Sequence, residues 1–173
     1  MAAHSSARDP AGLSRRLAAM AYDLLLLAAL AAVATFAFLP LSGGEALLVR
    51  TQGPLAHVYH ATQLLLALGY FGISWTRGGQ TLGMRAWRIR LQAAGGGAAN
   101  WPDAIVRFTI GAALLMLAAV GLWELRTTHS PLHTACALLL LLPALANLAW
   151  IACDRGHRSL QDIAGGLRVV RSA

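Results

Sequence analysis

The stretch that decides the fold is "RRLAAMAYDLLLLAAL", residues 15–30. Two arginines lead into an apolar run that continues to about residue 41. A helix needs about 20 such residues to cross the ~30 Å hydrocarbon layer of a bilayer. Asp23 lies inside this run, where an aspartate costs about 2.5–3.5 kcal/mol if it reaches the bilayer centre. The stretch therefore predicts a membrane-spanning helix with a buried charge that requires compensation.

The composition of the whole chain supports a membrane protein. Of the 173 residues, 57% are hydrophobic and 12% are charged, whereas about 25% are charged in a typical soluble domain. Apolar blocks cover about residues 17–41, 55–75, 104–123 and 132–152. We therefore predict an all-α membrane protein: a four-transmembrane-helix bundle over residues 13–173, after a disordered cytoplasmic N-terminus of residues 1–12.

The first block also has features of a secretory signal peptide, since it combines a basic lead with an apolar core. Its apolar run is long for a signal core, however, and Asp23 interrupts it. We therefore expect the block to be retained as a membrane helix.

The arginines predict the orientation in the membrane. All fourteen basic residues are arginine, and the formal net charge is +7. They concentrate before the first block, between the second and third blocks and after the fourth. Because positively charged loops stay in the cytoplasm, we expect a multi-pass membrane protein with both termini cytoplasmic. Nucleic acid is a weaker explanation, since the arginines flank apolar blocks.

Two short segments have the pattern of β-strands. In "MRAWRIRLQ", residues 84–92, apolar side chains alternate with arginines, as in a strand with one covered face. "LRVVRS", residues 167–172, is β-branched and flanked by arginines. We expect the two segments to pair as a small cytoplasmic β-ribbon, although an isolated two-stranded ribbon is only marginally stable.

Asp23 has a candidate partner in the third block. Arg107 lies about one turn inside that block and enters the membrane from the same side. Charged groups at this depth usually pair with each other or line a wet cavity. The pair is interpreted either as a structural ion pair that fixes helix register, or as an ion or proton site. We favour the structural interpretation, because no second acidic side chain lies deep in the membrane.

Charged residues recur after the fourth block. In "DRGHRSLQDIAGGLRVV", residues 154–170, Asp154, Arg158 and Asp162 are spaced four apart. If the helix continues past Gly156, these side chains form one charged stripe. The "AGG" after Asp162 and Ile163 is a helix-stop signal.

Three motifs together resemble the RDD family of bacterial membrane proteins. They are "RRLAAMAYD" (residues 15–23), "GQTLGMRAWRIRL" (residues 79–91) and "LQDIAGGLRVV" (residues 160–170). The resemblance identifies Arg16, Asp23 and Asp162 as the arginine and two aspartates that give the family its name. It implies a protein of the bacterial plasma (inner) membrane with a cytoplasmic-side polar cluster, in which we expect Arg16 to bridge both carboxylates. Some members of the family have been linked to ion exchange or transport.

Four histidines near the predicted outer side are candidate metal ligands. His57 and His60 are three positions apart, and His129 and His133 are four apart, so each pair lies on one side of a helix. Nothing in the sequence brings the two pairs together. We therefore expect no metal and no cofactor; the weak candidates are His57, His60, His129 and His133.

The tryptophans lie at the block ends. This distribution is typical of the aromatic belts that anchor helices at the two membrane surfaces. The five residues concerned are Trp75, Trp87, Trp101, Trp123 and Trp150.

These observations favour a small membrane scaffold or accessory subunit over an enzyme, because no arrangement of nucleophile and base is visible. We expect the lipid bilayer as its surroundings and either a homo-oligomer or another membrane protein as its partner. The alternative is an oligomeric ion or proton transporter, such as a cation/proton exchanger, with Asp23 as the titrating group. The polar cluster of either function would draw on Arg16, Asp23, Arg107, Asp154, Arg158 and Asp162.

Overall fold

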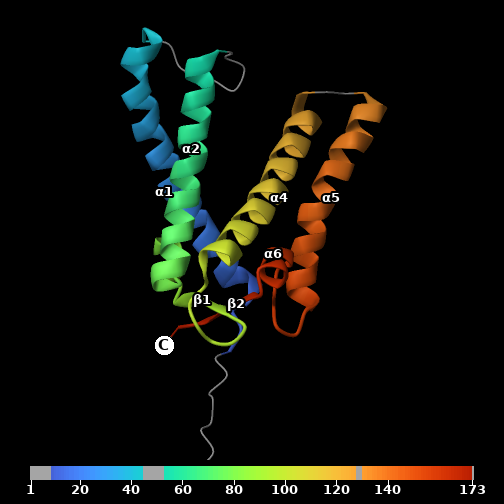
Figure 1. Cartoon of the computed structure of the whole chain (residues 1–173). Coiled ribbons are helices and arrows are strands. Elements are labelled where there is room, and N and C mark those ends of the chain that lie inside the picture. Colours follow the sequence, from blue (N-terminus) through green and yellow to red (C-terminus); the bar gives the residue numbers. More distant parts are fainter. Residues whose placement is uncertain (1–8, 45–52, 128–129, 173) are drawn as a thin grey trace, which may run out of the picture.

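The computed structural model describes residues 9–44, 53–127 and 130–172. Two long helical hairpins start from one shared end and diverge away from it (Figure 1). The first hairpin is α1 (Leu13–Phe38), extended by the 3₁₀ turn η1 (Leu39–Ser42), with α2 (Pro54–Ile73). The second is α4 (Trp101–Thr127) with α5 (Pro131–Cys153). The shared end holds η2 (Ser74–Gly78), α3 (Leu82–Ala86), β1 (Ile89–Ala93), α6 (Leu160–Ala164) and β2 (Leu167–Arg171).

Three helical segments are long and apolar enough to cross a membrane. They are Leu13–Ser42, Trp101–Thr127 and Pro131–Cys153, so the predicted four-helix bundle is confirmed for three of its four spans. α2 has the length of a span, but its first turns carry polar side chains. Gln63 of α2 donates to the carbonyl of Ala31 at 3.2 Å, and Tyr59 shares a 2.8 Å hydrogen bond with Thr35. The polar side of α2 therefore faces α1.

The outer surfaces of the long helices are apolar. Leu25, Phe36 and Leu139 are 71%, 73% and 63% exposed. Contiguous exposed apolar surface of this kind is rare on soluble monomers, and it suits helices surrounded by lipid. Between α4 and α5 the backbones approach closely: a Cβ on Gly121 would lie 2.8 Å from the carbonyl oxygen of Ala137. Small residues allow this approach in membrane helices.

The predicted β-ribbon is confirmed. β1 and β2 pair antiparallel, with Leu91 opposite Val169. Both side chains are 1% exposed and belong to the apolar core at the shared end, which also contains Trp75 and Met84. This core explains why so short a ribbon is stable, since ribbons without a covered face are marginal.

Both edges of the ribbon are covered. On the β1 side, the Leu91 N–H donates to the carbonyl of Gly79 at 2.7 Å. On the β2 side, Pro10 pairs with Val170, and the Ala11 N–H donates to Val169 at 3.0 Å. The predicted disorder of residues 1–12 is therefore wrong for residues 9–12, because the unpaired edge of β2 offers them backbone hydrogen bonds. Residues 1–8 lie outside the described residues.

The predicted charged stripe after the fourth block does not form. α5 ends at Cys153, Asp154 leaves the helical conformation, and His157 has a left-handed φ of 49°. A separate helix, α6, then starts at a capping box formed by Ser159 and Asp162. The capping box turns Asp162 into the protein interior, where it is fully buried.

Asn147 of α5 joins this helix to α6. Its side chain accepts from the Leu160 N–H at 2.8 Å and donates to Gln161 at 3.2 Å. A polar side chain inside an apolar helix thus satisfies the backbone at the start of a neighbouring element.

Trp75 departs from the predicted aromatic belt. It is 5% exposed and stacks on Phe71 with ring centroids 5.0 Å apart. It belongs to the core because the π-helical turn η2 directs it inward. The other four tryptophans are exposed, as the belt requires.

Candidate functional site: two buried aspartates at the shared end

Asp23 is the centre of the first polar site. It lies on α1, is 3% exposed, and accepts hydrogen bonds from three donors. The Tyr70 hydroxyl donates at 2.7 Å, the Thr81 hydroxyl at 2.6 Å and the Gly83 backbone N–H at 2.9 Å. The donors come from α2 and from the turn into α3, so the carboxylate of Asp23 holds this turn against α1.

The local sequence explains why the turn fits Asp23. Thr81 is the N-cap of α3, where its hydroxyl accepts from the Met84 N–H at 3.1 Å and donates to Asp23. Gly83 allows the close approach, because a Cβ there would lie 2.9 Å from the Asp23 Cγ and would also collide with the Ala19 carbonyl. Only a residue without a side chain fits between α1 and α3 at this point.

Asp162 is the centre of the second polar site. Arg16 Nη1 donates to Asp162 Oδ2 at 2.6 Å, and Arg107 forms an ion pair with Oδ1. The Ser159 N–H also donates to Oδ2 at 3.1 Å. One fully buried carboxylate thereby joins α6 to α1 and to α4. Buried charges are tolerated when they are paired and hydrogen-bonded in this way.

Arg107 has a second contact besides Asp162. Its guanidinium lies 4.9 Å from the ring centroid of Trp75, a cation–π geometry. Arg16 is held from another side, since its Nε donates to the Ala11 carbonyl at 3.1 Å. The two arginines thus connect the N-terminal segment, η2, α4 and α6 around a single acidic group.

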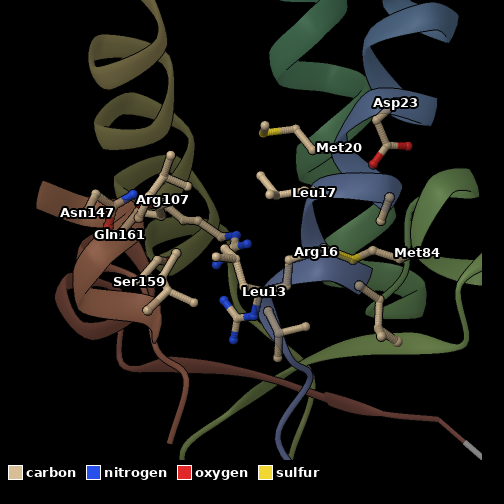
Figure 2. A pocket seen from close by; sticks show the side chains of 15 residues that line it. Leu13, Arg16, Leu17, Met20, Asp23, Met84, Arg107, Asn147, Ser159 and Gln161 are labelled. Atoms are coloured by element: carbon tan, nitrogen blue, oxygen red, sulfur yellow. Dashed lines mark hydrogen bonds between the residues drawn. The ribbon is translucent and has the colours of Figure 1, made fainter. Parts of the chain in front are cut away.

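A cavity of about 130 Å³ lies between the two polar sites. Its walls come from α1, α3, α4, α5, α6 and the ribbon, and the guanidinium groups of Arg16 and Arg107 both face it (Figure 2). Asp23 lies on the opposite side of the view, turned away from the arginines. Met20 and Leu17 stand between Asp23 and the arginine pair.

The expected pairing of Asp23 with Arg107 is wrong. Arg107 pairs with Asp162, and Asp23 is satisfied by uncharged donors. The expected bridge from Arg16 to both carboxylates is also wrong, because Arg16 reaches only Asp162. These four residues lie at one end of the molecule as expected. Arg16 and Arg107 both pair with Asp162, whereas Arg16 was expected to pair with both aspartates.

Asp154 and Arg158 stay outside these two sites. They pair with each other at the protein surface, with Arg158 Nε 3.3 Å from Asp154 Oδ2. The Arg158 backbone N–H donates to the same oxygen at 2.9 Å. This backbone contact, followed by the side-chain contact, lowers the pKa of Asp154 below its usual value.

The histidine candidates lie far from the polar sites along the helices. His57 and His60 belong to α2 and His133 to α5, whereas His129 lies outside the described residues. Among the described residues, no group of three His, Cys, Asp or Glu side chains is placed to hold a metal.

Several partners of Asp23 lie too far away in the chain to be predicted from the sequence. Tyr70, Thr81 and Gly83 lie 47 to 60 positions from Asp23 in the chain, so no local spacing connects them. Two local signals were present, however. "GQTLG" contains a Thr N-cap and a glycine two positions later, and "SLQD" has the spacing of a capping box at residues 159–162.

Comparison with known proteins agrees with the motifs. The RDD family model matches residues 10–166, which include Arg16, Asp23 and Asp162 and both polar sites. No curated protein and no solved structure matches the chain. The match covers nearly the whole chain, and the chain belongs to the RDD family.

Proposed function

We propose that the protein is a scaffold or accessory subunit of the bacterial inner membrane, in which the buried aspartates are structural tethers. The observation that carries this proposal is the coordination of Asp23. A carboxylate offers about four lone-pair positions, and three donors already bind the Asp23 oxygens. Little of the carboxylate is left to bind a transported cation.

The chemistry around Asp23 supports the same function. Hard cations are bound by several oxygen ligands that act as electron donors. The Tyr70 and Thr81 hydroxyls instead direct their protons at Asp23, and Gly83 contributes an N–H. These groups suit a permanent anion that holds segments together.

The second site supports a tether in the same way. Asp162 joins α6 to α1 and α4 through Arg16 and Arg107. Removing one partner of such a buried set typically costs about 3–5 kcal/mol, because a charge is left without compensation. Both aspartates thus bind the small shared end to the long helices.

The proposed placement in the membrane follows from charge. The shared end carries arginines on the middle segment and the C-terminal segment, including Arg88, Arg90, Arg168 and Arg171. Positive charge of this kind favours the cytoplasmic side. We place both termini there and α2 across the membrane as a fourth span, beside α1. The apolar outer faces then contact lipid, another membrane protein or a second copy.

Ion flux through reconstituted protein tests this function. Wild type, Asp23→Asn and the surface control Asp154→Asn are inserted into liposomes, and sodium and proton flux are recorded. We expect the ion flux of all three proteins to equal that of protein-free liposomes. We expect Asp23→Asn alone to lose thermal stability or assembly. Coupled flux in wild type that disappears in a folded Asp23→Asn protein would instead support the cation/proton exchanger.

A further inference from the structure

The cavity beside the second polar site contains unsatisfied hydrogen-bond donors. Arg16 Nη2 and Arg107 Nε are buried and have no hydrogen-bond partner among the described residues. Both arginine side chains are only 10% exposed, and both line the 130 Å³ cavity. Buried guanidinium donors without an acceptor are costly. The cavity therefore suits a ligand that brings oxygen atoms to them.

The local charge selects an anion. Arg16 and Arg107 share the single carboxylate of Asp162, so this group of three carries one excess positive charge. The other nearby carboxylates are already engaged. Asp23 lines the far wall and accepts from three donors. Asp154 lies outside the cavity, where it pairs with Arg158 and also attracts Arg16 through space. In a membrane protein an uncompensated charge at this depth attracts an opposite one.

The shape and chemistry of the cavity narrow the choice of anion. A guanidinium fork matches the oxygens of a phosphate, to which it donates two parallel hydrogen bonds. The volume of about 130 Å³ is far above the ~10–15 Å³ that a single water requires. A group with several oxygens can therefore enter and meet both arginines.

One side of the cavity is apolar and open to the outside of the helices. Leu17 and Met20 of α1 line it and are 39% and 45% exposed, and Leu148 and Ile151 of α5 complete this wall. In Figure 2 the side chains of Leu17 and Met20 project from α1 into the space that the arginines face. An anionic head next to an apolar wall is the arrangement that a phospholipid requires.

We propose that this cavity binds the phosphate of an anionic phospholipid from the cytoplasmic leaflet. Arg16 and Arg107 donate to the phosphate oxygens, and Leu17 and Met20 contact the first methylene groups of the lipid. The proposal rests on the proposed function only for the cytoplasmic placement of the shared end. A lipid can bind here whether or not the protein moves ions, so the liposome experiment and a binding experiment fail independently.

The test is a titration of purified protein in a phosphate-free maltoside detergent, followed by calorimetry. The probes are dihexanoyl-phosphatidylglycerol, as a soluble anionic lipid, and inorganic phosphate. We expect the lipid to bind at least about tenfold more tightly than phosphate, because only the lipid also buries methylene groups against the apolar wall.

Three variants locate the binding. Arg16→Gln removes one guanidinium from the cavity and is expected to weaken lipid binding about tenfold, the value of one charge-assisted hydrogen bond. Arg15→Gln is the matched control, since Arg15 is adjacent on α1 but does not line the cavity. Met20→Trp adds bulk at the cavity wall without touching either ion pair, so it blocks the lipid even if Arg16→Gln fails to fold.

The binding of the three variants and of inorganic phosphate decides whether the lipid site exists. Weaker binding in folded Met20→Trp, and also in Arg16→Gln where that variant folds, with Arg15→Gln like wild type, supports the site. Equal losses in Arg15→Gln and Arg16→Gln would show attraction by surface charge alone and overturn it, as would unchanged binding in Met20→Trp. Inorganic phosphate that binds as tightly as the lipid, with the same dependence on Arg16, would show a site for free phosphate and overturn the lipid assignment.

Discussion

Asp162 is shared by Arg16 and Arg107, so that one carboxylate of α6 joins α1 to α4. The residues are far apart in the chain: Arg16 lies 146 positions from Asp162. The contact is possible because the capping box at Ser159 turns the Asp162 side chain inward as α6 begins. A local helix-start signal thus positions the anion on which the packing of the hairpins depends.

Asp162→Asn tests this dependence. The substitution leaves two buried guanidinium groups without their anion, and the expected loss is about 3–5 kcal/mol in the free energy of unfolding. Thermal unfolding of the protein in detergent measures it. Asp154→Asn is the control, because Asp154 pairs at the surface, where ion pairs contribute little to stability. Equal melting temperatures for both variants would contradict the tether.

Gly83→Ala tests the close contact between α1 and α3. The added Cβ meets the Ala19 carbonyl and the Asp23 carboxyl group, so α3 must move away and lengthen the hydrogen bond from the Gly83 N–H. We expect a loss of about 1–3 kcal/mol, as for overpacking of a closed core.

The control for Gly83→Ala is Gly111→Ala on α4, where a Cβ meets no atom within 4 Å. Alanine is favoured over glycine inside a helix by about 0.5–1 kcal/mol, so this control is expected to be neutral or stabilising in the same thermal measurement. A Gly83→Ala protein as stable as Gly111→Ala would show that α3 does not press on α1.

The pKa of Asp154 is expected to depend on backbone geometry more than on its arginine partner. The Arg158 N–H is the main cause of the lowered pKa, and the Arg158 side chain comes second. Arg158→Gln keeps the N–H, so it should raise the pKa of Asp154 only part of the way to its usual value. A carbon-detected NMR titration of the Asp154 carboxyl measures this.

The sign of the linked stability follows from the lowered pKa. Ionised Asp154 stabilises the folded state above its unfolded pKa of about 3.9. That contribution disappears as the pH falls through the lower folded pKa. A full return of the pKa to its usual value in Arg158→Gln would show that the side chain, not the backbone, holds the carboxylate.

Much of the architecture could be predicted from the sequence, because it is encoded in local patterns. The apolar blocks located the long helices, and the alternation around Ile89 and the β-branched run at Val169 located the ribbon. The helices begin and end within a few residues of the predicted positions. The alternation of apolar residues and the hydropathy of a block depend only on neighbouring residues, so both can be read from a single sequence.

The partners of the charged residues could not be predicted in the same way. Asp23 and Arg107 lie at similar positions in two apolar blocks predicted to start from the same side of the membrane, and this similarity alone suggested that they pair. Which charges meet is decided by the turn after η2 and by the capping of α6, which bring Thr81 to Asp23 and Asp162 to Arg107. These are contacts between distant segments, and the sequence shows only the turn signals that make them possible.

Removal of the N-terminal segment tests how the ribbon is protected. The Arg171 N–H donates to the Asp9 carbonyl at 2.9 Å, whereas the Leu91 N–H on the opposite edge donates to Gly79 at 2.7 Å. Deletion of residues 1–11 should therefore speed hydrogen exchange at the Arg171 amide and leave the Leu91 amide protected, because only the β2 edge loses its partner. Deletion of residues 1–8 is the control and should change neither amide. If Arg171 exchanges equally slowly in both deletions, the segment from Asp9 to Ala11 does not protect the β2 edge of the ribbon.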